Sequence, residues 1–228
     1  MTQLGRPWRP DAQVLYREST LNATVKTAQP WTDMSGNTWR NARFQPRQLS
    51  TARSTLIRSH AADGFAAGTT GGAGGQTVTA TTYADLVRYA SSSTAYTIKV
   101  DRAITVTPYG TEIKVASNKT IIGVGTAGQI VNGGFNLTDV SNVIIRNLTI
   151  RDTRMADDDP GDDGYDYDGI QVDASRNVWI DHNTILRMND GLIDLRKDST
   201  NITVSWNRLG ENNKAFGIGW TTNVTART

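Results

Sequence analysis

Short runs of alternating apolar and polar residues fill the chain from about residue 78 onward. Three runs resemble one another: NVIIRNLTI (142–150), NVWIDHNTI (177–185) and NITVSWNRL (201–209). Each begins with an asparagine and continues with β-branched residues, which is typical of short strands. KTIIGVGTAGQI (119–130) is a looser copy, and NVTART (223–228) starts like a further one. The pattern predicts a mainly β structure built from repeats.

The spacing of the repeats indicates how the strands are arranged. The copies begin at residues 142, 177, 201 and 223, at intervals of 35, 24 and 22 residues. Irregular periods of just over 20 residues predict a β-solenoid, in which each turn buries its apolar face on its neighbours. The longer interval predicts a loop insertion and contains the acidic run Asp157–Asp168. The alternative is a β-sandwich with asparagine-rich turns, although sandwich strands rarely repeat their sequence.

A few segments depart from the alternating pattern. ADLVRYA, within Tyr83–Ser91, has helical spacing, and Thr81 or Thr82 could cap the helix. TTGGAGGQTVT (69–79) is a glycine-rich break where the composition changes. Upstream, AQVLYREST and NATVKTA predict two further strands, and Gln48–His60 has the weak helical character of a connector.

Composition and charge narrow the class of protein. The 228 residues suffice for one domain or slightly more, and 24 basic against 22 acidic side chains give a net charge of +2, which does not favour nucleic acid. Residues 1–60 hold eight arginines, whereas seven aspartates lie within 157–168, an asymmetry that suggests two pieces of different origin. The absence of cysteine excludes disulfides and cysteine-based zinc sites. No segment approaches the ~18 apolar residues of a membrane span, and MTQLGRPWRPDAQ lacks the apolar core of a signal peptide.

Three aspartates are placed where a solenoid would bring them together. Asp168 precedes the predicted strand GIQVD, while Asp190 and Asp194 flank GLI. Equivalent positions on successive turns lie about 5 Å apart, and calcium takes about six to eight oxygen ligands, largely carboxylates and water. Gly191 permits the bend that lets Asp190 and Asp194 face the same side. A single aspartate would more simply be a solvated turn residue, but the set predicts a calcium site.

Other candidate sites are less well supported. His182 follows Asp181 in VWIDHN, but strand alternation predicts that the two side chains face opposite sides. Its repeat equivalents, Asn147 and Trp206, favour a packed, hydrogen-bonded histidine over a catalytic one. The EF-hand template fails because its downstream glutamate is missing, and TTGGAGG lacks the Lys-Ser/Thr of a phosphate loop.

From about Asp63 to the end, the chain resembles the pectate lyases of polysaccharide lyase family 1. The resemblance rests on GFAAGTTGGAGG, SNKTIIGVG, NVIIRNLTIRDT, DYDGIQVD, NVWIDHNT, DGLIDLRKDST, ITVSWN and NKAFGIGW. It implies a right-handed, single-stranded parallel β-helix over residues 63–228, truncated at its C-terminal end, and calcium-dependent cleavage of polygalacturonate by β-elimination. It also implies a secreted protein, monomeric in its full-length form, that acts on pectin and has no nucleic-acid or membrane partner.

The resemblance assigns roles to individual residues. Asp168, Asp190 and Asp194 match the calcium ligands of the family, and Asp166 matches a secondary acid at the substrate-bound calcium ions. Lys214 matches the lysine that contacts the substrate carboxylate, which is not the base. Arg196 stands where the family often has a substrate-binding lysine.

The base of the family is an arginine on the turn after NVTART, which would lie beyond Thr228. Arg227 does not match it, because Arg227 belongs to the preceding strand. The chain would then be a non-catalytic, calcium-dependent pectate-binding fragment. A β-helix pectin hydrolase or esterase remains a further alternative, with Asp190 and Asp194 as the acid and base of a hydrolysis.

Residues 4–47 resemble a different family, the C-terminal end of pectin methylesterases. LGRPWRPDAQVLYREST, QPWTDM and NTWRNARF carry this resemblance. Arg6 and Trp8 match substrate-contacting residues, but the catalytic aspartates of that family would lie upstream of Met1, and packing is the preferred role for Trp8 and Trp31. The predicted division is a methylesterase-like tail (1–47), a connector (48–62) and a lyase-like β-helix (63–228).

Overall fold

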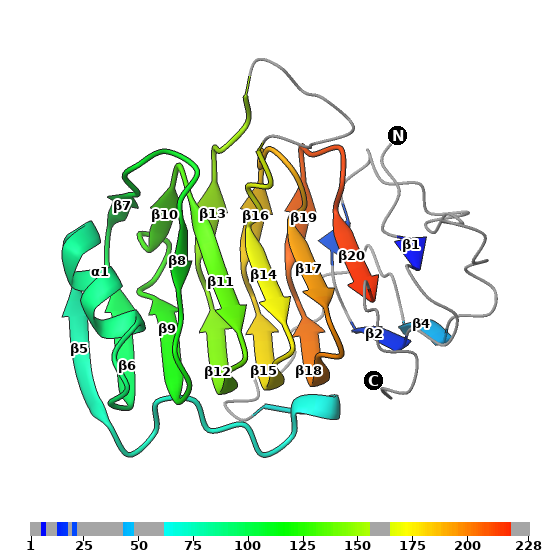
Figure 1. Ribbon diagram of the computed structural model, residues 1–228, viewed down its shortest axis with the longest axis horizontal. Helices are drawn as coiled ribbons and strands as arrows, with labels where there is room; N and C mark the ends of the chain where they lie inside the picture. Colours follow the sequence, from blue (N-terminus) through cyan, green and yellow to red (C-terminus); the bar gives the residue numbers. More distant parts are fainter. Residues whose placement is uncertain are drawn as a thin grey trace.

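The chain folds as a parallel β-solenoid of about six turns (Figure 1). The computed structural model describes residues 62–155 and 165–219, together with four short strands at 6–7, 13–17, 20–21 and 43–47. All strand pairs among the described residues are parallel, and from β6 to β20 strands that follow one another in the chain belong to different sheets. These features confirm the predicted solenoid and contradict the alternative β-sandwich.

Each full turn places one strand in each of three parallel sheets. In spatial order, sheet 1 contains β1 (Arg6–Pro7), β20 (Phe216–Gly219), β17 (Ile193–Arg196), β14 (Ile170–Asp173), β11 (Gly134–Thr138) and β8 (Glu112–Lys114). Sheet 2 contains β4 (Arg43–Arg47), β2 (Gln13–Arg17), β18 (Thr200–Ser205), β15 (Arg176–Asp181), β12 (Ser141–Arg146), β9 (Lys119–Gly123), β6 (Tyr96–Val100) and β5 (Gln76–Ala80). Sheet 3 contains β3 (Thr20–Leu21), β19 (Arg208–Gly210), β16 (Thr184–Leu186), β13 (Thr149–Arg151), β10 (Gln129–Val131) and β7 (Ala103–Thr105).

The three sequence repeats occupy equivalent places on successive turns. Val143 pairs with Val178, and Val178 pairs with Ile202. Each repeat forms two strands rather than one: a six-residue strand in sheet 2 and then a three-residue strand in sheet 3. The long interval between the first two repeats contains the connection from β13 to β14, as the predicted insertion requires.

Left-handed backbone positions produce the bends of each turn. The asparagines that open the repeats have φ of 61°, 55° and 54°, and the residues between the two strands have φ of 54°, 54° and 55°. Asparagine adopts this region more readily than most residues, which explains its recurrence at the turn into each strand. The six residues are Asn142, Asn177, Asn201, Asn147, His182 and Trp206.

Aliphatic side chains stack along the interior of the solenoid. One column in sheet 2 runs through five consecutive strands, and its members pair in register: Ile98, Ile121, Ile145, Ile180 and Val204. Each is at most 3% exposed. Burying one such side chain contributes about 1.5–3 kcal/mol, so each turn is stabilised mainly by its neighbours.

A short helix packs at the end of the solenoid formed by β5 and β6 (Figure 1). Helix α1 spans Tyr83–Ala90, and the Asp85 N–H donates to Thr82 Oγ1 at 3.1 Å. This confirms the predicted helix, with Thr82 as its cap. Leu86 and Ala90 are fully buried against the first turns. No helix among the described residues is long and apolar enough to cross a membrane.

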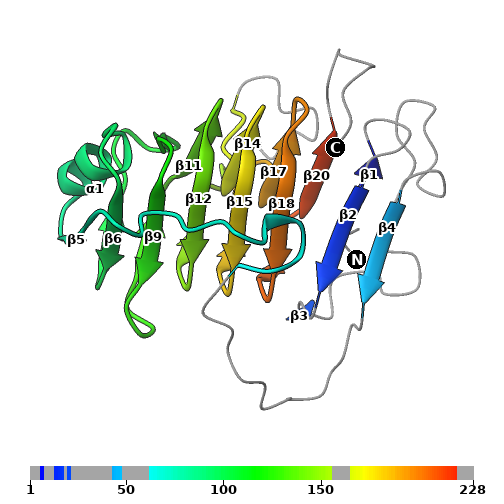
Figure 2. The same ribbon diagram turned by 90° about the horizontal axis from the view of Figure 1, so that it is seen from below.

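The glycine-rich segment lies across the outer face of sheet 2 (Figure 2). The Ala66 N–H donates to Thr203 Oγ1 at 2.9 Å, and the Gly72 N–H donates to Thr120 Oγ1 at 3.0 Å. A Cβ at Gly72 would lie 1.9 Å from the Tyr96 carbonyl oxygen. These glycines therefore allow the chain to lie directly on the sheet and link distant turns.

The strands of the amino-terminal part pair with the last described turn. β1 pairs with β20, β2 with β18 and β3 with β19, and β4 adds to β2. The strand predicted in AQVLYREST corresponds to β2, whereas NATVKTA lies outside the described residues. The division at residues 47 and 62 and the methylesterase-like character of the first segment stay predictions.

Candidate metal centre

Four aspartates lie at the corner where the chain passes from sheet 3 to sheet 1. Asp166 and Asp168 lie on the connection into β14, Asp190 precedes β17, and Asp194 belongs to β17. Carboxylate oxygens of Asp166, Asp168 and Asp190 lie within 4.8 Å of one another. Asp194 faces the same space, because its Oδ1 and that of Asp168 both lie close to Gly191. Asp166, Asp168 and Asp190 thus form the cluster, and Asp194 lies beside it.

Gly191 makes room for this arrangement. A Cβ there would lie 2.7 Å from Asp194 Oδ1 and 2.8 Å from Asp168 Oδ1. The Gly191 N–H donates to Asp168 Oδ1 at 2.7 Å. Gly191 was expected to provide backbone freedom, but its φ is not in the left-handed region. The requirement is for space between the carboxylates.

Asp168 is the most strongly perturbed acid of the cluster. Its side chain is fully buried, and among the described residues its Oδ2 has no hydrogen-bond partner. Burial raises the pKa of Asp168 well above its usual value, and the nearby carboxylates of Asp194, Asp166 and Glu112 raise it further. A buried carboxylate among like charges is unfavourable unless it takes up a proton or binds a cation.

Asp190 and Asp194 also hold protons more tightly than ordinary aspartates. Burial is the largest cause in both cases and raises the pKa of Asp190 to about 7 and that of Asp194 to about 6. The Lys214 ammonium group, which pairs with Asp190 Oδ1, opposes this rise. For Asp194, the charge of Arg196 is the main opposing effect. The cluster can therefore take up or release protons near neutral pH.

Lys214 is fixed beside the cluster by its backbone. Asn212 Nδ2 donates to the carbonyl oxygens of Asp190 and Lys214, at 2.6 and 2.9 Å. This amide joins two successive turns and holds Lys214 next to Asp190. Lys214 thus lies where a cation could meet an anionic ligand bound at the acids.

Arg196 faces carboxylates of the protein itself. Its residue is 6% exposed, and its Nε and Nη2 donate to the two oxygens of Asp173 at 2.8 and 3.2 Å. Its Nη1 lies 3.5 Å from Asp166 Oδ2, and Lys197 Nζ also donates to Asp173 at 2.7 Å. Arg196 therefore connects Asp173 to the acidic cluster. Sequence reasoning missed Asp173, although the register pairs it directly with Arg196 in the adjacent strand.

Glu112 is a further acid that the sequence did not reveal. Its Oε1 accepts the Asp168 N–H at 3.2 Å, and its Oε2 accepts Asn136 Nδ2 at 3.0 Å. Burial raises the pKa of Glu112 to about 7, and the charge of Asp166 adds to the rise. TEIKV carries none of the repeat motifs, so only the strand register, which pairs Glu112 with Gly134, leads to it.

His182 lies at a different corner, between sheets 2 and 3. Its Nδ1 lies 2.6 Å from Asp181 Oδ2, so the prediction that the two side chains face opposite sides is wrong. The reason is the φ of 54° at His182, which ends the strand and turns the ring back toward Asp181. The ring also stacks on Trp206 at a centroid distance of 5.6 Å. The histidine is packed and hydrogen-bonded, as its repeat equivalents suggested.

The acidic corner fits a calcium ion by its donor set. Calcium prefers carboxylate oxygens in flexible arrangements, and four aspartates converge here with one buried oxygen left without a partner. The chain contains no cysteine, and His182, the histidine among the described residues, does not belong to the cluster. The set is therefore hard and all-oxygen, which suits calcium better than zinc.

Known proteins are similar to this chain in sequence and in fold. Residues 48–227 match the family model described as pectate lyase. The chain belongs to the pectate lyase family. A pectate trisaccharide-lyase of Thermotoga maritima is 43% identical over 152 residues, which cover 67% of this chain and 41% of that protein. Pectate lyase plyB of Emericella nidulans is 37% identical over 211 residues and covers 89% of this chain.

The chain also resembles solved pectate lyases in structure. A pectate lyase from Bacillus sp. N165 in complex with trigalacturonate has a TM-score of 0.60 and 31% sequence identity and covers 73% of this chain and 58% of that one. The chain thus spans between two fifths and three fifths of the length of the relatives named here. The fold and family follow from these matches, and the activity of the whole protein is a matter of proposal.

Proposed function

We propose that this chain binds calcium and polygalacturonate at its acidic corner, as part of a pectate lyase that cleaves by β-elimination. The observation that carries the proposal is Asp168, which is fully buried among carboxylates and keeps one oxygen without a partner among the described residues. The relatives named as pectate lyases and the trigalacturonate complex of the Bacillus enzyme support the choice of substrate.

Asp166, Asp168, Asp190 and Asp194 would hold the ion. Bound calcium would attract the carboxylate of a galacturonate unit and make the adjacent carbon–hydrogen bond more acidic. Asp168 is rigid because Gly191 and Glu112 fix it from two sides. Asp166 is half exposed at the rim of the cluster, which suits contact with a substrate-bound ion.

Lys214 and Arg196 would have separate tasks. The Lys214 side chain is 26% exposed and pairs with Asp190, so it can reach the carboxylate of a bound sugar once calcium neutralises that acid. Arg196 would position Asp166 from inside the protein. Lys214 would thus bind substrate directly, whereas Arg196 would act through a metal ligand.

The elimination itself removes the proton at C5 of a galacturonate unit and breaks the C4–oxygen bond, which leaves an unsaturated uronate and a new chain end. The base is not assigned among the residues that the structure describes. The family resemblance gives this role to an arginine on the turn after residues 223–228. We further propose a monomeric enzyme that acts outside the cell, where pectin occurs.

Hydrolysis is a second candidate reaction because one acid of the cluster has a raised pKa, as a proton donor in hydrolysis needs. The pKa of Asp190 is raised to about 7, so it could donate a proton near neutral pH while Asp194, with a pKa of about 6, acts as the base. The two reactions leave different products. Only elimination creates a carbon–carbon double bond, which absorbs in the ultraviolet.

The test combines binding with product analysis. The protein is incubated with polygalacturonate at about pH 9 with calcium or with a chelator, and ultraviolet absorbance, reducing ends and retention on immobilised polygalacturonate are measured. Elimination predicts a calcium-dependent rise in absorbance. Retention without a new absorbance indicates a binding fragment, reducing ends without absorbance indicate the hydrolase, and no calcium-dependent retention contradicts the proposal.

A further inference from the structure

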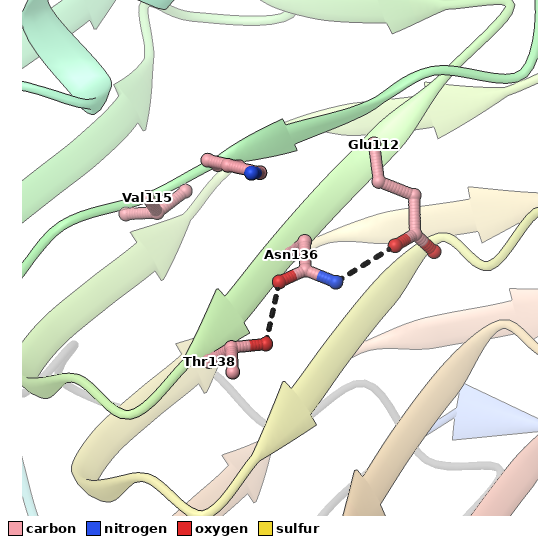
Figure 3. A pocket seen from close by; sticks show the side chains of 5 residues that line it. Glu112, Val115, Asn136 and Thr138 are labelled. Carbon is pink, nitrogen blue, oxygen red and sulfur yellow. Dashed lines mark hydrogen bonds between the residues drawn. The ribbon is translucent and has the colours of Figure 1, made fainter.

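A pocket lies on the outer face of sheet 1, on the turns that precede the acidic corner. Its volume is about 550 Å³, and it is lined by Glu112, Lys114, Val115, Asn136 and Thr138 (Figure 3). It contains none of the four aspartates. It therefore represents a separate place where a ligand could bind on the same face.

The strand register connects this pocket to the acidic corner. Lys114 pairs with Asn136, Asn136 with Gln171, and Gln171 with Asp194. The four residues form one row across the strands of sheet 1. Three strand spacings of about 4.8 Å place Lys114 about 14 Å from Asp194. An extended polymer that lies along this row from the acidic corner would reach the pocket.

Lys114 differs from the other cations near this row. Lys214 pairs with Asp190, and both Arg196 and Lys197 pair with Asp173. Lys114 is exposed, and it makes neither an ion pair nor a side-chain hydrogen bond with any described residue. Its charge is therefore available to an anionic ligand in the pocket.

The floor of the pocket is ordered by hydrogen bonds. Asn136 Nδ2 donates to Glu112 Oε2 at 3.0 Å, and Thr138 Oγ1 donates to Asn136 Oδ1 at 2.7 Å (Figure 3). A carboxamide has two donor hydrogens and two acceptor lone pairs, so Asn136 keeps one of each for a ligand. Such fixed amide and hydroxyl groups suit the hydroxyls of a sugar.

We infer that this pocket is a distal subsite in which the Lys114 ammonium group binds the carboxylate of a uronate unit several sugars away from the acidic corner. The inference rests on the proposed function, because it takes the polymer bound at the acids to be the ligand. Lys114 would act as a specificity residue for chain length. Short oligomers held at the acids would not reach it, whereas longer ones would.

The experiment measures binding rather than cleavage. Isothermal titration calorimetry with calcium present gives the Kd of digalacturonate and of hexagalacturonate for the unchanged protein, for Lys114→Gln and for Lys114→Glu. The matched control is Lys99→Gln, since Lys99 is an exposed lysine on β6 in sheet 2. Circular dichroism of each variant checks that the solenoid is intact.

The expected result is a selective loss of affinity for the long ligand. Lys114→Gln raises the Kd of hexagalacturonate about fivefold, as expected for the loss of one exposed charge pair, and Lys114→Glu raises it further. Both variants bind digalacturonate like the unchanged protein, and the control binds both ligands normally. Equal hexagalacturonate affinity in the Lys114 variants and the control overturns the subsite and leaves the proposed function standing. If the unchanged protein binds neither ligand with calcium, the proposed function and the subsite fall together.

Discussion

Two corners of the solenoid each contain a fully buried aspartate, and they differ in what surrounds it. Asp181, between sheets 2 and 3, receives hydrogen bonds or ion pairs from Arg146, His182 and Ser205, at 2.9, 2.6 and 2.7 Å. Asp168, between sheets 3 and 1, accepts the Gly191 N–H on one oxygen and has no partner on the other among the described residues, and other carboxylates surround it.

The difference separates a buried acid that the protein itself satisfies from one that we propose to bind a ligand. A buried charge is tolerated when partners of opposite charge or good donors satisfy it. Asp181 meets that condition within the protein, and the Arg146 guanidinium in turn lies 4.9 Å from the centre of the Trp179 ring. Asp168 does not meet it among the described residues, which agrees with its proposed role as a calcium ligand.

The largest expected effect concerns the corner that contains Asp181. Asp181→Ala leaves Arg146, which is largely buried, without its carboxylate and should lower the free energy of unfolding by about 3–5 kcal/mol. Urea unfolding measures this loss, and calcium affinity should stay unchanged. The control is Asp101→Ala, which removes a surface acid paired with Arg102 and should change stability little. A loss of calcium binding in Asp181→Ala would remove the distinction between the corners.

At the corner that contains Asp168, a substitution should weaken calcium binding without lowering the stability of the metal-free protein. Asp168→Asn removes a proposed calcium ligand and should raise the calcium Kd at least about 100-fold. It also removes a like charge from the buried cluster, so the metal-free protein should become more stable to urea near pH 8, a direction that follows from the raised pKa. Calcium titration calorimetry and urea unfolding in a chelator test both parts. A metal-free variant much less stable than the unchanged protein would show that Asp168 is structural after all.

The pH dependence should separate the corners further. The pKa of Asp190 is about 7 and that of Asp194 about 6 in the folded chain, whereas both are 3.8 ordinarily. Between the ordinary pKa and the raised ones, the folded state therefore binds more protons than the unfolded state. The free energy of unfolding of the metal-free protein therefore falls as the pH rises through this window.

Calcium competes with these protons, so its affinity should rise at least about tenfold from pH 5 to pH 8. Melting temperatures with calcium and with a chelator at both pH values measure the effect. A calcium-induced shift of the same size at both values would contradict it.

The smallest expected effect concerns the space between the acids. Gly191→Ala places a methyl group within 2.8 Å of two carboxylate oxygens, so the acids must move apart and calcium affinity should fall about fivefold. The matched control is Gly74→Ala, where a Cβ would meet no atom within 4 Å, although its positive φ makes some loss of stability expected there. Unchanged calcium affinity in Gly191→Ala would show that the carboxylates tolerate the added group.

Much of the fold could be predicted from the sequence because the repeats are local. NVIIRNLTI, NVWIDHNTI and NITVSWNRL share asparagines at left-handed positions and apolar residues at the same places, so they had to form equivalent parts of successive turns. The repeats did not reveal that each contains two strands in different sheets. That bend depends on a single residue in the left-handed region, and at His182 and Trp206 the residue type does not signal it.

For the candidate site, Asp168, Asp190, Asp194 and Lys214 were identified from the sequence because motifs carry them. Glu112 was missed because it lies outside every motif, and Asp173, although it ends DYDGIQVD, was missed because its role depends on pairing with Arg196 in the adjacent strand. Arg196 was expected at the substrate, whereas the structure shows it bonded to Asp173 and close to Asp166.

The sequence by itself determined the solenoid, the family and the four clustered aspartates, because repeat patterns and short motifs are properties of the order of residues along the chain. Only the tertiary structure decided which of two buried aspartates keeps an oxygen without a partner among the described residues, that Gly191 is needed for space and that Lys114 faces a pocket in line with the acids. These properties depend on distances between turns separated by about 20 residues or more, and strand register sets those distances.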